Sequence, residues 1–161
     1  MAEIRVAETS DIPRLAELEV LCFSIPWSEE SLRTFIMGTE RRKCFVCEDR
    51  TYHPSVIGYI GIQFVCEEAE IANLAVHPDR RKEGVGRALL EEAKRFCIEN
   101  AIEVLHLEVR SGNDTAITLY ERFGFLRTGR RKGYYADSGE DALLYSLMIT
   151  GETEPGMAPE E

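Results

Sequence analysis

The chain has 161 residues, 44% of them hydrophobic and 30% charged, as expected for a soluble globular protein. Its formal net charge of -10 argues against general nucleic-acid binding, which depends on neutralising phosphates with lysine and arginine. No apolar run approaches the roughly 20 residues of a membrane helix, and Met1–Arg5 lacks the apolar core of a signal peptide. We therefore expect a cytoplasmic protein without a membrane partner and without direct nucleic-acid binding.

Two helices are predicted in the first forty residues. Ser10 or Asp11 can cap the first helix. Its apolar residues recur at helical spacing as Leu15, Leu18 and Cys22. The Pro-Trp-Ser segment 26–28 then breaks the helix, and Ser28 caps a second one that ends near Gly38.

A hairpin and a further strand follow. Residues 44–48 and 56–65 read as its two strands, with a turn around His53 and Pro54, and residues 69–76 read as the next strand. Cys44 and Cys47 form a C-x-x-C pair, which raises the question of a zinc or redox site. A second pair is missing and residues three apart on a strand face opposite sides, so small core side chains are the favoured interpretation.

A glycine-containing turn follows this strand and opens a helix. The run from Arg80 to Leu90 reads RRKEGVGRALL. Gly84 and Gly86 allow a tight turn and remove side chains that would block a ligand. The first amides of the helix have no partner within it and carry partial positive charge, which makes a phosphate cradle. The flanking arginines and Lys82 are expected to reinforce this cradle.

The second half of the chain alternates helices and strands. The helix after the turn ends at Asn100, and a strand follows at 104–109 with leucines and valine on one side and His106, Glu108 and Arg110 on the other. Asn113 or Asp114 caps a short helix that Gly124 ends. Two last strands are predicted at 125–135 and 142–149. The complete order is β-α-α-β-β-β-α-β-α-β-β.

These motifs together resemble the GCN5-related N-acetyltransferases. The resemblance rests on the order of elements, the R-x-x-G-x-G turn, and the segments 107–113 (LEVRSGN) and 119–125 (LYERFGF). Within this superfamily the chain is most similar to the bacterial ribosomal-protein-alanine N-acetyltransferases, through PWS at 26–28, NLAVHP at 73–78 and RRKGYY at 130–135.

The resemblance implies an α/β fold: a central, mostly antiparallel twisted sheet with one splayed pair of parallel strands, flanked by helices. The domain would span residues 1–150, and the acidic residues 151–161 would form a mobile tail. Acetyl-CoA would be the co-substrate, without a metal. Its predicted contacts are Leu74, Ala75, Val76, Lys82, Glu83, Gly84, Val85, Gly86, Arg87 and Asn113.

The resemblance also implies that Glu108 is the general base and Tyr120 the general acid. Transfer to an amine requires the neutral amine, so a carboxylate can take its proton directly or through water, and a tyrosine can supply a proton to the departing thiolate. Each residue has a simpler interpretation: Glu108 as a solvated strand residue, Tyr120 as a core residue and Asn113 as a helix cap.

The predicted function is acetylation of the N-terminal alanine amine of a ribosomal protein by direct attack on acetyl-CoA. Trp27, Tyr134 and Tyr135 are candidates for the groove that binds the peptide, although aromatic residues near loops often complete a core. The alternatives are acetylation of other protein N-termini, of lysine or of a small amine, a non-catalytic acyl-CoA-binding domain, and an interaction module with a purely structural glycine turn.

Overall fold

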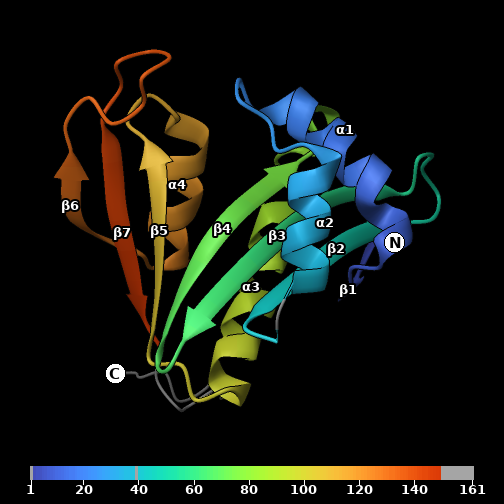
Figure 1. Ribbon diagram of the computed structural model, residues 1–161, viewed down its shortest axis with the longest axis horizontal. Helices are drawn as coiled ribbons and strands as arrows, with labels where there is room; N and C mark the ends of the chain where they lie inside the picture. The colour runs from blue at the N-terminus through green and yellow to red at the C-terminus, as the bar shows by residue number, and fades with distance from the viewer. Residues whose placement is uncertain (1, 39, 150–161) are drawn as a thin grey trace. The chain divides into compact units, whose positions relative to one another are not determined.

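The computed structural model of the protein describes residues 2–38 and 40–149, and its elements follow the predicted order (Figure 1). The strands are β1 (Ala2–Val6), β2 (Arg42–Asp49), β3 (Val56–Val65), β4 (Glu68–Val76), β5 (Val104–Arg110), β6 (Leu126–Arg131) and β7 (Ala142–Met148). The helices are α1 (Ile12–Cys22), α2 (Glu29–Gly38), α3 (Val85–Glu99) and α4 (Asp114–Phe123), with 3₁₀ turns at Thr9–Asp11 and Pro78–Arg80. The acidic segment 151–161 lies outside the described residues.

The strands form one seven-stranded mixed sheet in the order β1-β2-β3-β4-β5-β7-β6. β4 and β5 pair in parallel, from Glu68 opposite Val104 to Glu70 opposite His106. β1 with β2, β2 with β3, β5 with β7 and β6 with β7 pair antiparallel. The predicted α/β class, with a mostly antiparallel sheet and a parallel pair, is therefore confirmed.

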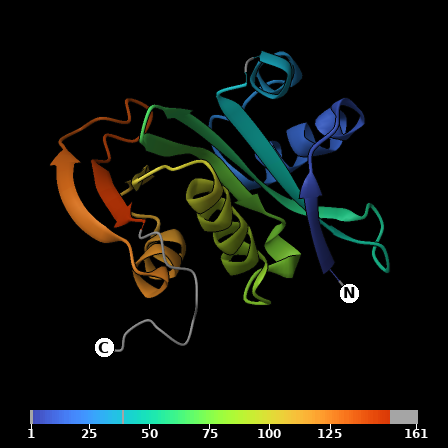
Figure 2. The same cartoon turned by 90° about the horizontal axis from the view of Figure 1, so that it is seen from below.

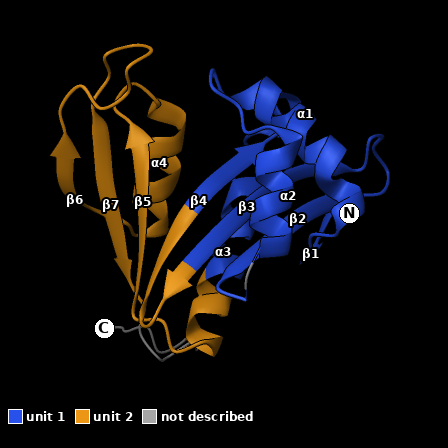
Figure 3. Cartoon of the chain, viewed as in Figure 1, with its two compact units in different colours: residues 1–63, 72–93 blue, residues 64–71, 94–161 orange. Residues whose placement is uncertain are grey.

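The chain divides into two compact units (Figure 3): residues 1–63 with 72–93, and residues 64–71 with 94–161. In the first unit, helices cover both faces of the strands (Figure 2). A side chain at Gly58 of β3 would contact Val85 and Leu89 of α3, whereas one at Gly61 would contact Phe35 of α2. Because residues three apart on a strand face opposite sides, α2 and the start of α3 lie on opposite faces of β3.

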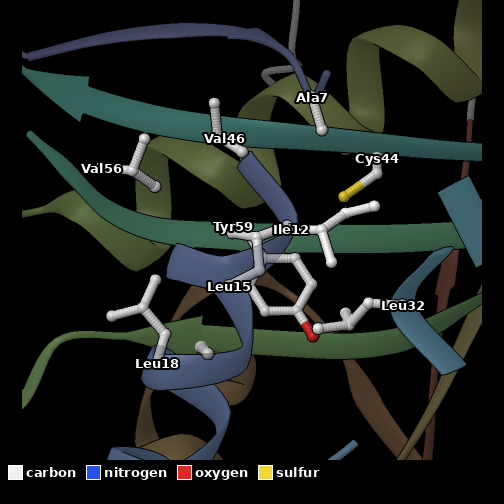
Figure 4. Packing of buried hydrophobic residues seen from close by; sticks show 10 residues of the cluster. Ala7, Ile12, Leu15, Leu18, Leu32, Cys44, Val46, Val56 and Tyr59 are labelled. Carbon is white, nitrogen blue, oxygen red and sulfur yellow. The ribbon is translucent and has the colours of Figure 1, made fainter. Parts of the chain in front are cut away.

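The core of the first unit lies beneath α1. Figure 4 shows Ile12, Leu15 and Leu18 of this helix together with Tyr59 of β3, and each of these side chains is at most 1% exposed. Burial of such side chains contributes about 1.5–3 kcal/mol each. The helical spacing of Leu15 and Leu18 in the sequence therefore marked the packing face of α1 correctly.

The helix starts differ in their capping. Ser28 accepts a hydrogen bond from the Ser31 amide, as predicted for α2. Asp11 precedes α1, but its carboxylate instead accepts the Glu8 amide and binds the Arg5 guanidinium. Asp11 therefore stabilises the chain before α1 rather than capping the helix through its side chain.

In the second unit, β5 buries alternate residues, with Leu105, Leu107 and Val109 at most 5% exposed. This confirms the predicted alternation. α4 ends at Gly124, whose φ of +119° is the left-handed conformation that favours glycine at a helix end. The predicted strand 125–135 is too long: β6 ends at Arg131, because the chain turns at Lys132 and at Gly133, which has a φ of +59°.

Cys44 and Cys47 are buried on β2 and both are free thiols. Burial raises the pKa of Cys44 to about 12. The interpretation of this pair as small core side chains is therefore confirmed. None of the helices in residues 2–38 and 40–149 has the length and apolar character required to cross a membrane.

Candidate active site

The predicted phosphate cradle lies in the first unit, between β4 and α3. Gly84 has a φ of +89°, and no atom lies within 4 Å of the position that its Cβ would take. The Ala88 amide donates to the Gly84 carbonyl oxygen at 2.9 Å and so closes the first turn of α3. The amides of Val85 and Gly86 precede this bond, at the start of the helix where the regular hydrogen-bond pattern supplies no acceptor. The turn thus leaves open space next to amides that can bind an anion.

Arg80 and Arg81 hold this turn in place. Arg80 binds the Asp49 carboxylate at 2.8 Å and Glu83 at 2.9 Å. Arg81 donates from Nε to the Val76 carbonyl oxygen at 3.1 Å, and from Nη2 to the Cys22 sulfur at 3.3 Å. Both guanidinium groups are therefore engaged by the protein, a role that the sequence analysis did not assign to them.

Leu74, Ala75 and Val76 occupy the last three positions of β4. The parallel ladder to β5 covers Glu68–Glu70, so within the described strands these three residues lie beyond it. The His77 amide, next in the chain, donates to the Ile57 carbonyl oxygen at 2.8 Å, which ties the end of β4 to β3. The end of β4 that is predicted to bind the cofactor is thus hydrogen-bonded to β3.

Glu108 lies in the second unit, on the half-exposed face of β5 and opposite Leu144 of β7. Its side chain is 26% exposed, and its carboxylate lies 3.3 Å from Nε of Arg131. In the sequence, Arg131 was noted only within the RRKGYY motif at 130–135. The structure makes it the ion-pair partner of the predicted general base.

Tyr120 is buried in α4, with its ring 5.8 Å from that of Phe125. Burial, together with the nearby Tyr135, raises the pKa of Tyr120 above its ordinary value of about 10. Burial and the charge of Glu108 also raise the pKa of Tyr135. With its pKa raised, Tyr120 stays protonated at neutral pH and above it.

Asn113 caps α4, because its side-chain oxygen accepts the Ala116 amide at 3.2 Å. The simpler interpretation of this residue is therefore confirmed, and its contact with acetyl-CoA stays a prediction. Just before it, the Gly112 amide donates to Glu140 at 3.1 Å. A Cβ at Gly112 would meet that carboxylate, which is the flexible end of the Glu140 side chain and would have to shift.

The three predicted groove aromatics have different environments. Trp27 packs against the core of the first unit, with its ring 5.5 Å from that of Phe35. Tyr134 is 52% exposed, and its ring lies 5.2 Å from that of Tyr135. Arg110 lies 4.0 Å from the centre of the Tyr135 ring. The role of all three in binding a peptide stays a prediction.

The profile of the Acetyltransferase (GNAT) family matches residues 12–125. The chain belongs to the GNAT acetyltransferase family. The resemblance seen in the sequence is thereby confirmed, and so are its fold and its class as an acetyltransferase.

Individual members of the GNAT family agree with this assignment. An Escherichia coli (strain K12) ribosomal protein bS18-alanine N-acetyltransferase is 35% identical over 93% of this chain and 99% of its own. A Bacillus subtilis protein provisionally given the same name is 35% identical over 92% of this chain and 96% of its own. The crystal structure of the Escherichia coli ribosomal-protein-S18-alanine N-acetyltransferase superposes with a TM-score of 0.83 at 34% identity, covering 96% of this chain and 98% of that one.

One polar cluster of this GNAT protein was missed from the sequence. Glu19 of α1 is fully buried, and its carboxylate accepts hydrogen bonds from Tyr59, Asn73 and the Trp27 amide. Burial raises the pKa of Glu19. The sequence did indicate that Glu19 is buried, because it lies four residues after Leu15 and three before Cys22, on the apolar face of α1. Among the described residues, no group of three or more histidine, cysteine, aspartate or glutamate side chains could hold a metal ion.

Proposed function

We propose that this protein transfers the acetyl group of acetyl-CoA to the N-terminal alanine amine of a ribosomal protein. The observation that carries this proposal is the 35% identity, over 93% of this chain and 99% of the relative, to the Escherichia coli bS18-alanine N-acetyltransferase. An enzyme with a ribosomal substrate would act in the cytoplasm, and its partner would be the N-terminal peptide of that substrate.

Acetyl-CoA is proposed to bind through the backbone of Leu74, Ala75 and Val76 and through the turn from Lys82 to Arg87, with Asn113 as a further contact. The turn suits a diphosphate, because a helix N-terminus favours anions and the position of a Cβ at Gly84, just before α3, is open space. Lys82 adds a cation in the same turn, while the Glu83 carboxylate is paired with Arg80. This pairing offsets the negative charge that Glu83 brings to the turn.

Bound acetyl-CoA supplies an activated thioester. Glu108 is proposed to take a proton from the acceptor ammonium, directly or through water. The neutral nitrogen then forms a bond to the acetyl carbon while the carbon–sulfur bond breaks, and Tyr120 gives its proton to the thiolate. The nitrogen, now positively charged, loses its second proton through water to the Tyr120 phenolate, which leaves a neutral amide, free CoA thiol and a neutral tyrosine. An N-terminal amine has a pKa of about 7.7–8.0, against about 10.4 for lysine. A single carboxylate base near neutral pH therefore suits an N-terminal acceptor better than a lysine.

The acceptor peptide is proposed to contact the turn after β6 through Tyr134 and Tyr135, and the loop before α2 through Trp27. Tyr134 supports this role because an aromatic ring that is half exposed offers an uncovered surface for an apolar side chain. The net charge of -10 is compatible with a basic peptide such as a ribosomal N-terminus, and it gives no support to direct RNA binding.

The test is release of free CoA thiol from acetyl-CoA with a panel of acceptors, followed by mass mapping of the acetylated nitrogen. The panel contains a peptide with N-terminal alanine, the same peptide with a blocked N-terminus and an internal lysine, and a small amine. We expect turnover only with the free alanine amine. Glu108→Gln should lower kcat by about 10²–10⁴-fold, and Tyr120→Phe should also lower it.

Acetylation of the blocked peptide at lysine, or of the small amine alone, would assign a different acceptor. Turnover that survives in both the Glu108→Gln and Tyr120→Phe variants would remove the catalytic assignment. Thermal stabilisation by CoA without turnover of any acceptor would instead identify an acyl-CoA-binding domain, because a ligand that binds only the folded state raises its stability.

A further inference from the structure

Glu19 connects three segments of the first unit that are distant in sequence. The Tyr59 hydroxyl of β3 and the Asn73 amide of β4 both donate to Oε2, at 2.5 Å and 2.6 Å. The Trp27 backbone amide donates to Oε1 at 2.8 Å. Each carboxylate oxygen therefore accepts from a different part of the fold: Oε2 from the sheet, and Oε1 from the loop that joins α1 to α2.

A buried carboxylate is costly unless donors satisfy it. Glu19 is fully buried, and the three donors that reach it are two neutral side chains and a backbone amide. Removing one partner of a buried polar contact leaves the other unsatisfied. The carboxylate thus favours a single arrangement of the loop at 23–28 relative to β3 and β4.

The same helix face is tied to β4 a second time. Cys22, one turn after Glu19, donates from its sulfur to the Val76 carbonyl oxygen at 3.3 Å, and Arg81 donates to the same oxygen. The two ties fall on Asn73 and Val76, which enclose Leu74 and Ala75 of the proposed acetyl-CoA strand. Glu19 also accepts a hydrogen bond from the loop that carries Trp27.

We propose that Glu19 is a positioning residue for the transfer reaction, holding the acceptor-side loop with Trp27 in register with the acetyl-CoA-binding end of β4. This inference rests on the proposed function, because its kinetic test measures acetyl transfer to a peptide. In this role Glu19 does not contact either substrate. Glu19 differs from Glu108 in that both of its carboxylate oxygens accept hydrogen bonds from the protein.

Glu19→Gln and Tyr59→Phe test this role. Glutamine keeps the size of the side chain but puts an NH₂ group among donors, so that Tyr59, Asn73 or Trp27 loses its acceptor. The matched control is Glu17→Gln, which removes an exposed carboxylate of the same helix that pairs with Arg14 at 3.0 Å. Thermal unfolding of each variant shows whether it is folded under the assay conditions.

The first readout is steady-state kinetics. For Glu19→Gln we expect KM for an N-terminal alanine peptide to rise about tenfold, within the roughly hundredfold that a 1 Å misplacement can cost. KM for acetyl-CoA should change by less than about twofold, because the tie at Val76 remains; the peptide effect of Tyr59→Phe should be smaller. The proposal would be overturned if the KM for the peptide were unchanged in both variants. It would also be overturned if the KM for the peptide and the KM for acetyl-CoA rose by the same factor, even if Tm falls.

The second readout does not need turnover. Trp27 is the sole tryptophan of the chain, so its fluorescence reports on the loop that Glu19 holds. Titration with CoA alone should change the emission of the wild-type protein and of Glu17→Gln, and should change it by less than half as much in Glu19→Gln. Absence of turnover with every acceptor would defeat the proposed function, whereas identical CoA responses in the wild-type protein, Glu19→Gln and Tyr59→Phe would defeat the role of Glu19.

Discussion

The guanidinium group of Arg131 lies 3.3 Å from the carboxylate of Glu108, so a cation of β6 is paired with the residue proposed as general base. The two residues come from strands that flank β7 on opposite sides. Arg131 is more than half exposed, and such an ion pair contributes only about 0.2–1 kcal/mol. It can therefore be displaced by an incoming ammonium group.

Arg131→Gln should lower KM for the acceptor peptide, because the arginine no longer competes with the peptide amine for the Glu108 carboxylate. An exposed ion pair of this strength corresponds to a change of about 1.5- to 5-fold. Initial rates at saturating acetyl-CoA measure it. Arg130→Gln is the control, since neighbouring residues of a strand face opposite sides and Arg130 pairs with Asp141. A raised KM in Arg131→Gln would mean that the arginine orients the base rather than competing for it.

The pH profile of kcat should lack an alkaline limb below pH 10. Because burial raises the pKa of Tyr120 above its ordinary value of about 10, its proton-donating form persists as the pH rises to that value. Rates at saturating substrates between pH 7 and pH 10 test this expectation. A decline with an apparent pKa at or below 10 that disappears in Tyr120→Phe would contradict it.

Gly84→Ala should weaken CoA binding and lower stability. The residue has a φ of +89° and no neighbouring atom that would clash with a Cβ, so the loss of stability is conformational and amounts to about 1–2 kcal/mol. Gly139→Ala is a matched control, with a φ of +77° and equally open surroundings in the second unit. Calorimetry with CoA should show a higher Kd for Gly84→Ala alone. Equal Kd values in the two variants would exclude the turn from the diphosphate site.

Asp11→Asn should lower the free energy of unfolding by about 1–3 kcal/mol at pH 7, because the buried carboxylate satisfies Arg5 and the Glu8 amide. Burial acts to raise the pKa of Asp11, but these bonds outweigh it and the net pKa is lowered. The stabilisation is therefore present above the unfolded value of about 3.9 and is lost as the pH falls through the folded-state pKa.

Urea denaturation at pH 7 and below pH 3 should show the difference between wild-type and Asp11→Asn shrinking with acid. Asp79→Asn provides an exposed aspartate for comparison, and it should change stability little at either pH. A difference for Asp11→Asn that stays constant from pH 7 to below pH 3 would mean that the charge of this carboxylate contributes nothing.

The local sequence pattern was sufficient to predict many of the elements of this fold and their buried faces. The alternation of β5 and the helical spacing in α1 predicted their buried faces, because burial repeats with the period of the element. The end of β6 was misjudged because Lys132 and Gly133 form a turn within an otherwise strand-like run. That turn leaves Tyr134 and Tyr135 in a loop instead of a strand.

The Glu19 cluster could not be assigned from local pattern. Its partners Tyr59 and Asn73 lie 40 and 54 residues along the chain, and nothing near Glu19 in sequence indicates them. The pairing of Arg131 with Glu108 was missed for the same reason, since it depends on β6 folding back beside β7. Residues that bond locally, such as Ser28 and Asn113, were predicted correctly.

The alternating burial of β5 has a consequence for how this enzyme can change. A shift of the strand by one position would bury His106, Glu108 and Arg110 and would expose Leu105, Leu107 and Val109 to water. The side of the sheet on which Glu108, the proposed general base, emerges is therefore fixed by three apolar residues of the same strand. A mutation that moved Glu108 to the other face of the sheet would therefore disrupt the interior of the second unit.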